Sequence, residues 1–182
     1  KPENIGFDVR NRVKIFDFGL AKELKRKDLV DVAGGLYEAT GLTGSRRYMA
    51  PEVVLCKPYG LSADVYSYSI VAWEVFTGKI PYDHMDYNMH FEEVAVKGTR
   101  PSTKIPGGPI SMIDLVLKGC DTDCTKRPDF TYVCKKLKHE SRLLQYDKTN
   151  HGHHHHLSSR TAYLMGQSSR SFIESQSRKI VL

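Results

Sequence analysis

The chain has 182 residues, with 27 Lys and Arg against 21 Asp and Glu, which gives a formal net charge of +6. This length suits one domain plus a tail, and the most apolar stretch, around residues 70–73, falls far short of the roughly 20 apolar residues that span a bilayer. Short basic runs such as residues 25–27 are flanked by acidic residues, so we expect neither nucleic-acid binding nor a membrane span.

Two short strands are predicted near the start of the chain, over residues 5–7 and 12–16, around a turn at residues 8–11. Such a hairpin returns Asp17 alongside Asn4. An amide oxygen and a carboxylate are ligands that Mg²⁺ takes from a protein when waters and substrate phosphates complete its octahedral shell. The spacing therefore predicts a magnesium site at Asn4 and Asp17, beside a nucleotide phosphate.

Three motifs follow one another in a family's order: Lys1-Pro2-Glu3-Asn4, Asp17-Phe18-Gly19 and Met49-Ala50-Pro51-Glu52. They resemble the catalytic loop, the magnesium motif and the activation-segment end of the protein kinase family. The resemblance covers about residues 1–146 and implies a mainly α fold, a kinase-like large lobe with a short β-hairpin near the N-terminus. It implies ATP and Mg²⁺ as cofactors and a protein as substrate.

The resemblance also gives roles to single residues of these motifs. Asn4 and Asp17 would be metal ligands, and Lys1 and Asp17 would be catalytic. Lys1 would bind the nucleotide phosphate and neutralise charge on the transferring phosphoryl group. For a lysine at this position taken alone, a plain surface charge is the alternative.

Several parts of the family pattern are not in these residues. The catalytic aspartate falls before Lys1, and the glycine-rich loop, the strand lysine and the helix glutamate of the small lobe are also missing. We therefore expect a fragment of a kinase, inactive as an isolated chain. The alternatives are a truncated, inactive product and a non-catalytic, kinase-like interaction module (a pseudokinase), against which the retention of Lys1, Asn4 and Asp17 argues.

The acceptor class is addressed by two further similarities. Lys1-Pro2-Glu3-Asn4 resembles serine/threonine kinases, which favours Ser and Thr hydroxyls as acceptors. Residues 64–78 look like the tyrosine-kinase-like branch of serine/threonine kinases, which shares this helix with true tyrosine kinases, so dual specificity stays open. Ser45 stands where the family has a threonine or serine that contacts the catalytic aspartate and lysine.

Residues 22–45 mix charges and hydroxyls without a helical or strand period, which predicts a mobile loop. A phosphate on this loop would add about two negative charges, which arginines such as those at 46–47 could pair. Thr40 and Thr43 are the leading candidates, Ser45 is another, and an upstream kinase is the partner that they imply. The alternative is that they are solvated loop residues.

A buried helix is predicted over residues 62–78, with apolar side chains on most sides. Ser62 is placed to cap its first turn, Asp64 lies at the positive end of the helix dipole, and Gly78 is placed to end it. The resemblance gives Asp64 a second role, which is to anchor the backbone of the catalytic loop. An ordinary helix-dipole aspartate is the alternative.

Three further helices are predicted, over residues 86–98, over residues 109–119 and from Pro128 onward. The pair Arg127-Pro128 resembles a late pair of the family, whose arginine would form a buried, structural bridge to Glu52. The last helix has a 3.6-residue period of apolar residues that predicts packing on the core: Phe130, Val133, Cys134, Leu137 and Leu144.

The cysteines and the end of the chain complete the pattern. Cys56, Cys120, Cys124 and Cys134 lack the spacing of a zinc site and fit buried thiols in a reducing compartment, so we expect a soluble, cytoplasmic protein. Residues 147–182 are of low complexity and are predicted to be a disordered tail. The histidine cluster at 151–156 is either a transition-metal site or an inert polar tract.

Overall fold

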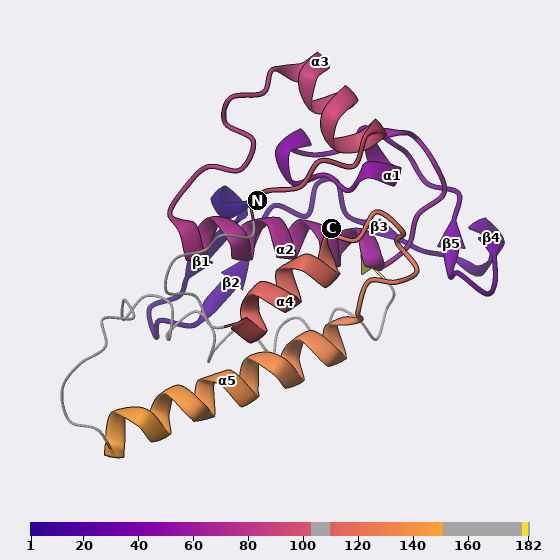
Figure 1. Ribbon diagram of the computed structural model, residues 1–182. Coiled ribbons are helices and arrows are strands. Elements are labelled where there is room, and N and C mark those ends of the chain that lie inside the picture. Colours follow the sequence, from indigo (N-terminus) through magenta and orange to yellow (C-terminus); the bar gives the residue numbers. More distant parts are fainter. Residues whose placement is uncertain (103–109, 151–179, 182) are drawn as a thin grey trace.

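The computed structural model describes residues 1–102, 110–150 and 180–181. Helix α2 (Ser62–Thr77) lies at the centre, α4 (Ile110–Gly119) packs along it, and α5 (Phe130–Asn150) lies beyond α4 (Figure 1). The opposite side of α2 carries α1 (Pro51–Val54) and α3 (Tyr87–His90), which continues as the π-helix η4 (Phe91–Val96). This arrangement confirms the mainly α fold.

The remaining elements are short. The strands form three two-stranded antiparallel pairs, β1 with β2, β3 with β6 and β4 with β5. Their bounds, with those of the 3₁₀ turns, are β1 (Ile5–Phe7), β2 (Val13–Ile15), β3 (Lys22–Glu23), β4 (Leu29–Asp31), β5 (Leu36–Tyr37), β6 (Ile180–Val181), η1 (Pro2–Asn4), η2 (Arg26–Asp28) and η3 (Arg46–Tyr48).

The predicted hairpin is confirmed in β1 and β2, where Phe7 lies opposite Val13. The Asp8 carboxylate closes the turn, because its Oδ1 accepts the backbone N–H groups of Arg10 and Arg12, each at 2.9 Å. The Arg12 side chain adds a 2.8 Å bond from Nε to Oδ2. These bonds, the Arg12 backbone bond first, lower the pKa of Asp8.

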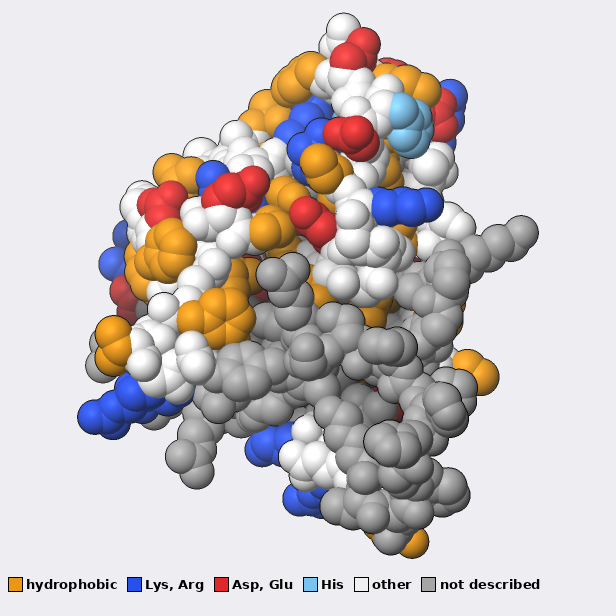
Figure 2. Space-filling view, turned by 90° about the vertical axis from the view of Figure 1, so that its left-hand side faces the viewer, with side chains coloured by type: hydrophobic (Ala, Val, Ile, Leu, Met, Phe, Trp, Pro, Cys, Tyr) orange, Lys and Arg blue, Asp and Glu red, His pale blue; other side chains and the backbone are white. Residues whose placement is uncertain are grey.

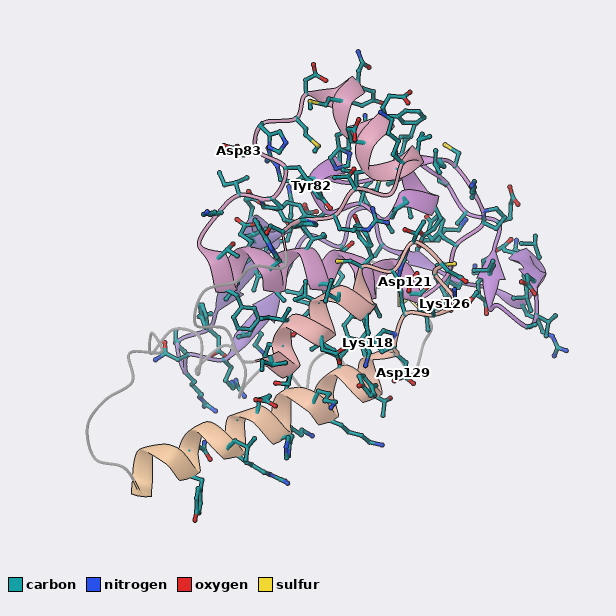
Figure 3. The ribbon with its side chains drawn as sticks, viewed as in Figure 1. Tyr82, Asp83, Lys118, Asp121, Lys126 and Asp129 are labelled. Carbon is teal, nitrogen blue, oxygen red and sulfur yellow. The ribbon has the colours of Figure 1, made fainter. Side chains whose placement is uncertain are left out.

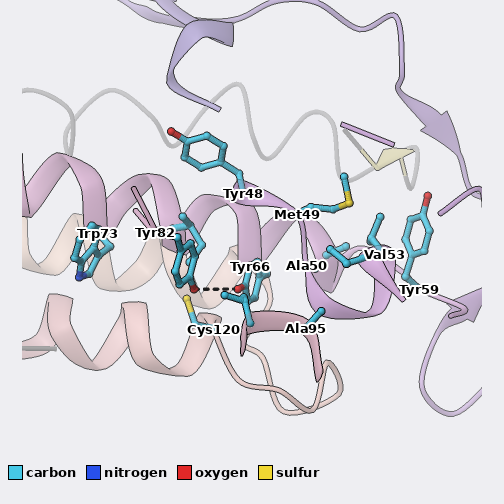
Figure 4. Close-up of a cluster of buried hydrophobic side chains, with 14 of the residues drawn as sticks. Tyr48, Met49, Ala50, Val53, Tyr59, Tyr66, Trp73, Tyr82, Ala95 and Cys120 are labelled. Carbon is cyan, nitrogen blue, oxygen red and sulfur yellow. Dashed lines mark hydrogen bonds between the residues drawn. The ribbon is translucent and has the colours of Figure 1, made fainter. Parts of the chain in front are cut away.

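Helix α2 separates two clusters of buried side chains. On one side Tyr66 and Ile70, which have no exposed surface, pack with residues of α1, η4 and α4 (Figure 4). On the other side Val65 packs with Met112 of α4 and Phe130 of α5. Burial of α2 on both sides confirms that it is the core of the domain.

The two ends of α2 can be compared with the predicted cap at Ser62 and the predicted end at Gly78. Gly78 ends the helix as expected, with a left-handed φ of 65° and its N–H donating to the Glu74 carbonyl at 2.8 Å. The predicted Ser62 cap is wrong: Leu61 holds the cap position, and no side chain caps the helix. Because Leu61 already has a helical backbone, Ser62 lies inside the first turn, where its hydroxyl is no longer in the capping position.

The other helices begin near their predicted residues. Asp86 caps α3, because its Oδ1 accepts the Met89 N–H at 2.8 Å. Helix α5 begins at Phe130, later than predicted, since Asp129 after the proline takes the capping role by accepting the Tyr132 N–H at 2.7 Å. Asp129 lies at the start of α5, and Asp121 and Lys126 mark the connection from α4 (Figure 3). The predicted apolar face is buried at Phe130, Val133, Cys134 and Leu137, whereas Pro109 and the Leu144 side chain lie outside what the structure describes.

The prediction of a loop without strands over residues 22–45 is wrong, because β3, β4 and β5 all fall inside it. Tyr37 is buried and exchanges backbone hydrogen bonds with Tyr59, at 2.9 and 3.1 Å. Further along, the Leu42 N–H donates to the Val53 carbonyl at 3.0 Å. The segment is thereby attached to the helical core at several points. Strands of two or three residues are too short for a period of two to be visible.

Two predictions concern the end of the chain and the cysteines. Helix α5 runs to Asn150 and β6 pairs with β3, whereas the histidine cluster and most of the predicted disordered tail lie outside the described residues. All four cysteines are free; Cys120 and Cys134 are buried, but Cys124 is half-buried and Cys56 is exposed, so the prediction of buried thiols is wrong for two of them. No helix in the described parts of the chain combines the length and the apolar character that crossing a bilayer requires.

Candidate functional site

A cavity of about 620 Å³ lies between the β1–β2 hairpin, the segment before α1 and helix α2. Most of its wall is apolar, with side chains such as Ile5, Val71 and Met112. Its polar wall brings together residues that are far apart in the sequence, namely Lys1, Asn4, Asp17, Thr43, Ser45 and Asp64. The cavity wall therefore includes the two predicted metal ligands, the lysine predicted to bind phosphate, and Ser45.

The hairpin positions Asn4 and Asp17. The Asn4 carbonyl accepts the Phe16 N–H at 3.1 Å, which extends the β1–β2 ladder by one step and leaves Asp17 as the next residue. Asp17 has a left-handed backbone with φ of 65°. Such a conformation costs roughly 1–2 kcal/mol for a residue other than glycine, although the short side chains of Asn and Asp tolerate it best.

The amide oxygen of Asn4 and the carboxylate of Asp17 are ligand types that fit Mg²⁺. Asn4 is half-buried and Asp17 is exposed, so the carboxylate is accessible to a ligand in the cavity. Among the described residues no group of three or more His, Cys, Asp or Glu side chains could hold a metal ion. One amide oxygen and one carboxylate suit a hard ion that keeps its waters and binds phosphate oxygens, and they do not suit a softer transition metal.

Helix α2 sets the position of Ser45 through Tyr48. The Ser45 carbonyl accepts the Tyr48 N–H at 3.0 Å and so opens the turn η3. The Tyr48 hydroxyl donates to Glu74 at 2.7 Å, and its carbonyl accepts the Ser67 hydroxyl at 2.8 Å. Burial, and then the bond to Glu74, raises the pKa of Tyr48, so its hydroxyl keeps its proton and this attachment to α2.

Asp64 lies in the first turn of α2 and also in the polar wall of the cavity. It is buried, with 8% of its surface exposed. The location places its carboxylate at the positive end of the helix dipole and in the same wall as Lys1 and Asn4. Both roles considered from the sequence are therefore compatible with where the structure puts Asp64.

The predicted phosphorylation sites differ in their surroundings. Thr40 is exposed and lies outside the cavity wall, and its carbonyl accepts the Tyr59 hydroxyl at 2.9 Å. Thr43 is half-buried in the cavity wall, and its hydroxyl donates to the carbonyls of Gly41 at 3.1 Å and Thr40 at 3.3 Å. Thr40 is thus the more accessible of the two hydroxyls.

The arginines that were expected to pair with such a phosphate are engaged elsewhere. The Arg46 guanidinium stacks on the Tyr87 ring, 3.3 Å from its centroid, and its Nε donates to His90 Nδ1 at 3.4 Å. Arg47 Nη2 lies 3.8 Å from the Asp83 carboxylate, in the segment before α3 (Figure 3). In this structure both arginines therefore serve the contact with the α3 region rather than a site on residues 40–45.

The cluster around His90 is a feature that the sequence did not reveal. Burial, followed by the positive charge of Arg46, lowers the pKa of His90 to about 4, which keeps the ring neutral and able to accept from Arg46. Within the described structure, His90 Nε2 and both terminal nitrogens of Arg46 are buried without a hydrogen-bond partner. The only feature of this cluster that the sequence analysis had noted was the arginine pair at residues 46–47. His90, which accepts from Arg46, lies 44 residues further along the chain.

Glu52 and Arg127 form the buried ion pair that the resemblance implied. Arg127 Nη1 donates to Oε1 at 2.6 Å and Nη2 donates to Oε2 at 2.8 Å. Arg127 also donates to the carbonyls of Ser62 at 3.1 Å and Asp121 at 2.9 Å, so it joins α1, the start of α2 and the α4–α5 connection. Neither residue lines the cavity, which is consistent with a structural role.

Exposed apolar side chains border the cavity. Phe7 and Phe16 on the hairpin and Leu20 after it line the cavity, and each is about half exposed or more, at 53%, 47% and 64%. The side of the molecule that carries β1 and β2 in Figure 1 faces the viewer in Figure 2, where apolar side chains reach the surface. These three side chains therefore line the cavity and are also open to solvent.

Comparison with known proteins identifies the family of the chain. The family model described as "Protein kinase domain" matches residues 1–140. The chain is 36% identical over 138 residues to serine/threonine-protein kinase STY46 of Arabidopsis thaliana, covering 76% of this chain and 22% of that protein. It is 35% identical over 155 residues to serine/threonine-protein kinase STY17 of the same plant, covering 85% of this chain and 25% of that protein.

A further relative carries a different description. The dual specificity protein kinase shkC of Dictyostelium discoideum is 37% identical over 141 residues, covering 76% of this chain and 26% of that protein. The chain thus spans about a quarter of the length of these relatives. The matched relatives include both serine/threonine and dual specificity kinases.

Proposed function

Because this chain belongs to the protein kinase family, we propose that it forms the large lobe of a serine/threonine kinase, which transfers the γ-phosphate of ATP to protein hydroxyls. The observation that carries the proposal is the cavity whose wall holds Lys1, Asn4, Asp17 and Ser45 together. Phosphoryl transfer requires groups that bind a metal ion and the phosphates close to groups that bind the acceptor hydroxyl. These four residues could supply both kinds of group.

Each side chain has a distinct part in the proposal. Asn4 and Asp17 would hold Mg²⁺, which when bound neutralises charge on the nucleotide phosphates. The Lys1 ammonium would stabilise negative charge on the transferred phosphoryl group. Ser45, held by Tyr48 and α2, would lie at the edge where the protein substrate enters.

Acceptor class and regulation are part of the same proposal. The motif Lys1-Pro2-Glu3-Asn4 favours Ser and Thr as acceptors, although several matched relatives are described as dual specificity kinases. An upstream kinase would modify Thr40 or Thr43, of which Thr40 is the exposed one. Four free thiols in a chain of this size favour a reducing, cytoplasmic location.

The proposed metal site at Asn4 and Asp17 is tested with Mn²⁺, a paramagnetic ion that replaces Mg²⁺. Binding to the 182-residue chain is titrated by electron paramagnetic resonance, which counts free Mn²⁺. Removing one of two protein ligands should weaken binding by about tenfold or more in Asp17→Asn and in Asn4→Ala. Asp83→Asn is the matched control, because Asp83 is an exposed carboxylate outside the cavity wall. Mn²⁺ binding that is weakened equally in all three variants, or a wild-type chain that binds no Mn²⁺, would overturn the proposed metal site.

A further inference from the structure

Helix α5 packs on the rest of the molecule by one side. Phe130, Val133 and Leu137 are buried on that side and belong to the cluster that includes residues of α2 and α4. In Figure 1 α5 lies at the edge of the described part of the chain, next to α4. The apolar side of this helix is therefore already covered, and its other side faces away from the core.

The outward side of α5 carries a line of basic side chains. Lys135, His139 and Arg142 follow one another at helical spacing, so they lie on one face of the helix, and Lys138 lies beside them. Each of these side chains is exposed. Figure 3 shows nitrogen-tipped side chains that point from α5 away from α4. At 1.5 Å per residue, the line from Lys135 to Arg142 is about 10 Å long.

Acidic side chains do not balance this charge. Between residues 130 and 146 the only acidic residue is Glu140, which is buried with 9% of its surface exposed. Among the side chains that the structure describes, none forms an ion pair with Lys135, Lys138 or Arg142. By contrast, Lys118 of α4 has an acidic partner one turn earlier, at 2.8 Å. The outer face of α5 is thus a concentrated positive surface.

The character of this face favours a membrane over a folded protein as its partner. Protein interfaces have an apolar centre that is depleted in lysine and holds pockets for anchoring side chains. An anionic membrane presents continuous negative charge and attracts grouped Lys and Arg without a pocket. Leu143 and Tyr146, which are 46% and 66% exposed, follow the basic line along α5. Leucine and tyrosine are side chains that enter the membrane interface beside such cations.

We propose that the outer face of α5, formed by Lys135, Lys138, His139 and Arg142, is a binding surface for anionic lipid membranes. Each Lys or Arg near such a membrane strengthens binding by about fivefold. Leu137, on the buried side of α5, lines the cavity described above, so the membrane surface and the cavity lie on different sides of the helix. Membrane binding through this face requires neither nucleotide nor metal, so it is independent of the proposed function.

The experiment measures binding of the 182-residue chain to lipid vesicles by co-sedimentation. One set of vesicles is phosphatidylcholine alone, and the other contains about one third phosphatidylserine. We expect the wild type to bind the phosphatidylserine vesicles only, and more weakly as the salt concentration rises from about 0.1 M to about 0.5 M. The triple variant Lys135→Gln, Lys138→Gln and Arg142→Gln should bind about a hundredfold more weakly, because three cations are lost.

A second triple variant is the matched control. Lys27→Gln, Lys57→Gln and Lys79→Gln removes the same charge from exposed lysines outside α5. Its binding to phosphatidylserine vesicles should stay within a few-fold of wild type, because the charge near the membrane is unchanged. Far-ultraviolet circular dichroism checks that both variants keep the helical content of the wild type.

A third variant, Lys135→Arg with Lys138→Arg and Arg142→Lys, keeps the charges and changes the hydrogen-bonding geometry. It should bind like wild type, because diffuse attraction does not depend on that geometry. Equal losses in the two glutamine variants, equal binding to both kinds of vesicle, or no binding by the wild type would overturn the proposal. Polyglutamate or single-stranded RNA that binds more tightly than the vesicles at equal charge concentration would overturn it in favour of an acidic protein or a nucleic acid.

Discussion

The side chain of Arg127 is completely buried and bonds to the Glu52 carboxylate and to the carbonyls of Ser62 and Asp121. Arg127→Ala would leave the Glu52 carboxylate buried without its partner. We expect the free energy of unfolding to fall by about 3–5 kcal/mol, measured by urea unfolding with circular dichroism. The double variant Arg127→Met with Glu52→Leu removes both charges and should recover much of that loss. A double variant as unstable as Arg127→Ala would show that the loss does not come from the unpaired charge.

His90 predicts a pH dependence of stability. Burial and the Arg46 charge lower its pKa from 6.5 to about 4 in the folded chain, so between these values the unfolded chain binds a proton that the folded chain does not. The contribution of His90 to the free energy of unfolding is therefore complete above pH 6.5 and is lost as the pH falls toward 4, by an amount on the order of 3 kcal/mol.

The His90→Gln variant isolates this effect. Glutamine keeps an acceptor for Arg46 Nε but does not titrate. Urea midpoints measured from about pH 7 down to about pH 4.5 should decline less in His90→Gln than in the wild type. Parallel declines in the two proteins would refute the assignment to His90.

At the scale of elements, the contact between α2 and α4 depends on Gly119. A Cβ atom at this position would overlap the Ser69 hydroxyl of α2 and lie 3.0 Å from the Ser69 Cβ. Gly119→Ala should therefore force the helices apart and cost about 1–3 kcal/mol of unfolding free energy.

Ser69→Gly offers the matched test. Removing the Ser69 side chain opens the space that the new methyl group needs, so the double variant should lose less stability than the sum of the two single variants. Thermal unfolding of the four proteins gives this coupling. Strictly additive losses would mean that Gly119 is not required for a close approach of the helices.

The helix signals that the sequence revealed are local ones. Gly78 at the end of α2 and Asp86 at the start of α3 act through the backbone of their own turn, and both were recognisable. Ser62 misled because the residue before it is already helical. The strands β4 and β5 were not predicted because two or three residues are too few to show a period of two.

The same division applies to the site. The position of Asn4 and Asp17 in the wall of one cavity was predictable, because one short hairpin separates the two residues. The contact of Arg46 with His90 was not, since it requires α3 to pack against the segment before α1, and neither sequence carries a signal for the other. The exposed Cys56 was likewise missed, because composition alone does not indicate which thiols are covered.

At the scale of the whole molecule, we predict that the 182-residue chain alone transfers no phosphate at a measurable rate. The residue that would orient the acceptor hydroxyl, and the groups that would cover the nucleotide, are not among its residues. Incubation with radiolabelled ATP, Mg²⁺ and a mixed protein substrate measures the rate, with an active kinase as the positive control. Turnover that Asp17→Ala abolishes would contradict the prediction.

Helix α2 contributes to both buried clusters, Tyr66 and Ile70 to one and Val65 to the other. Because the same helix covers both clusters, an opening that exposes one cluster to water also removes the side chains that cover the other. The parts of the chain around the two clusters should therefore share one melting temperature and unfold together in a single cooperative transition on heating.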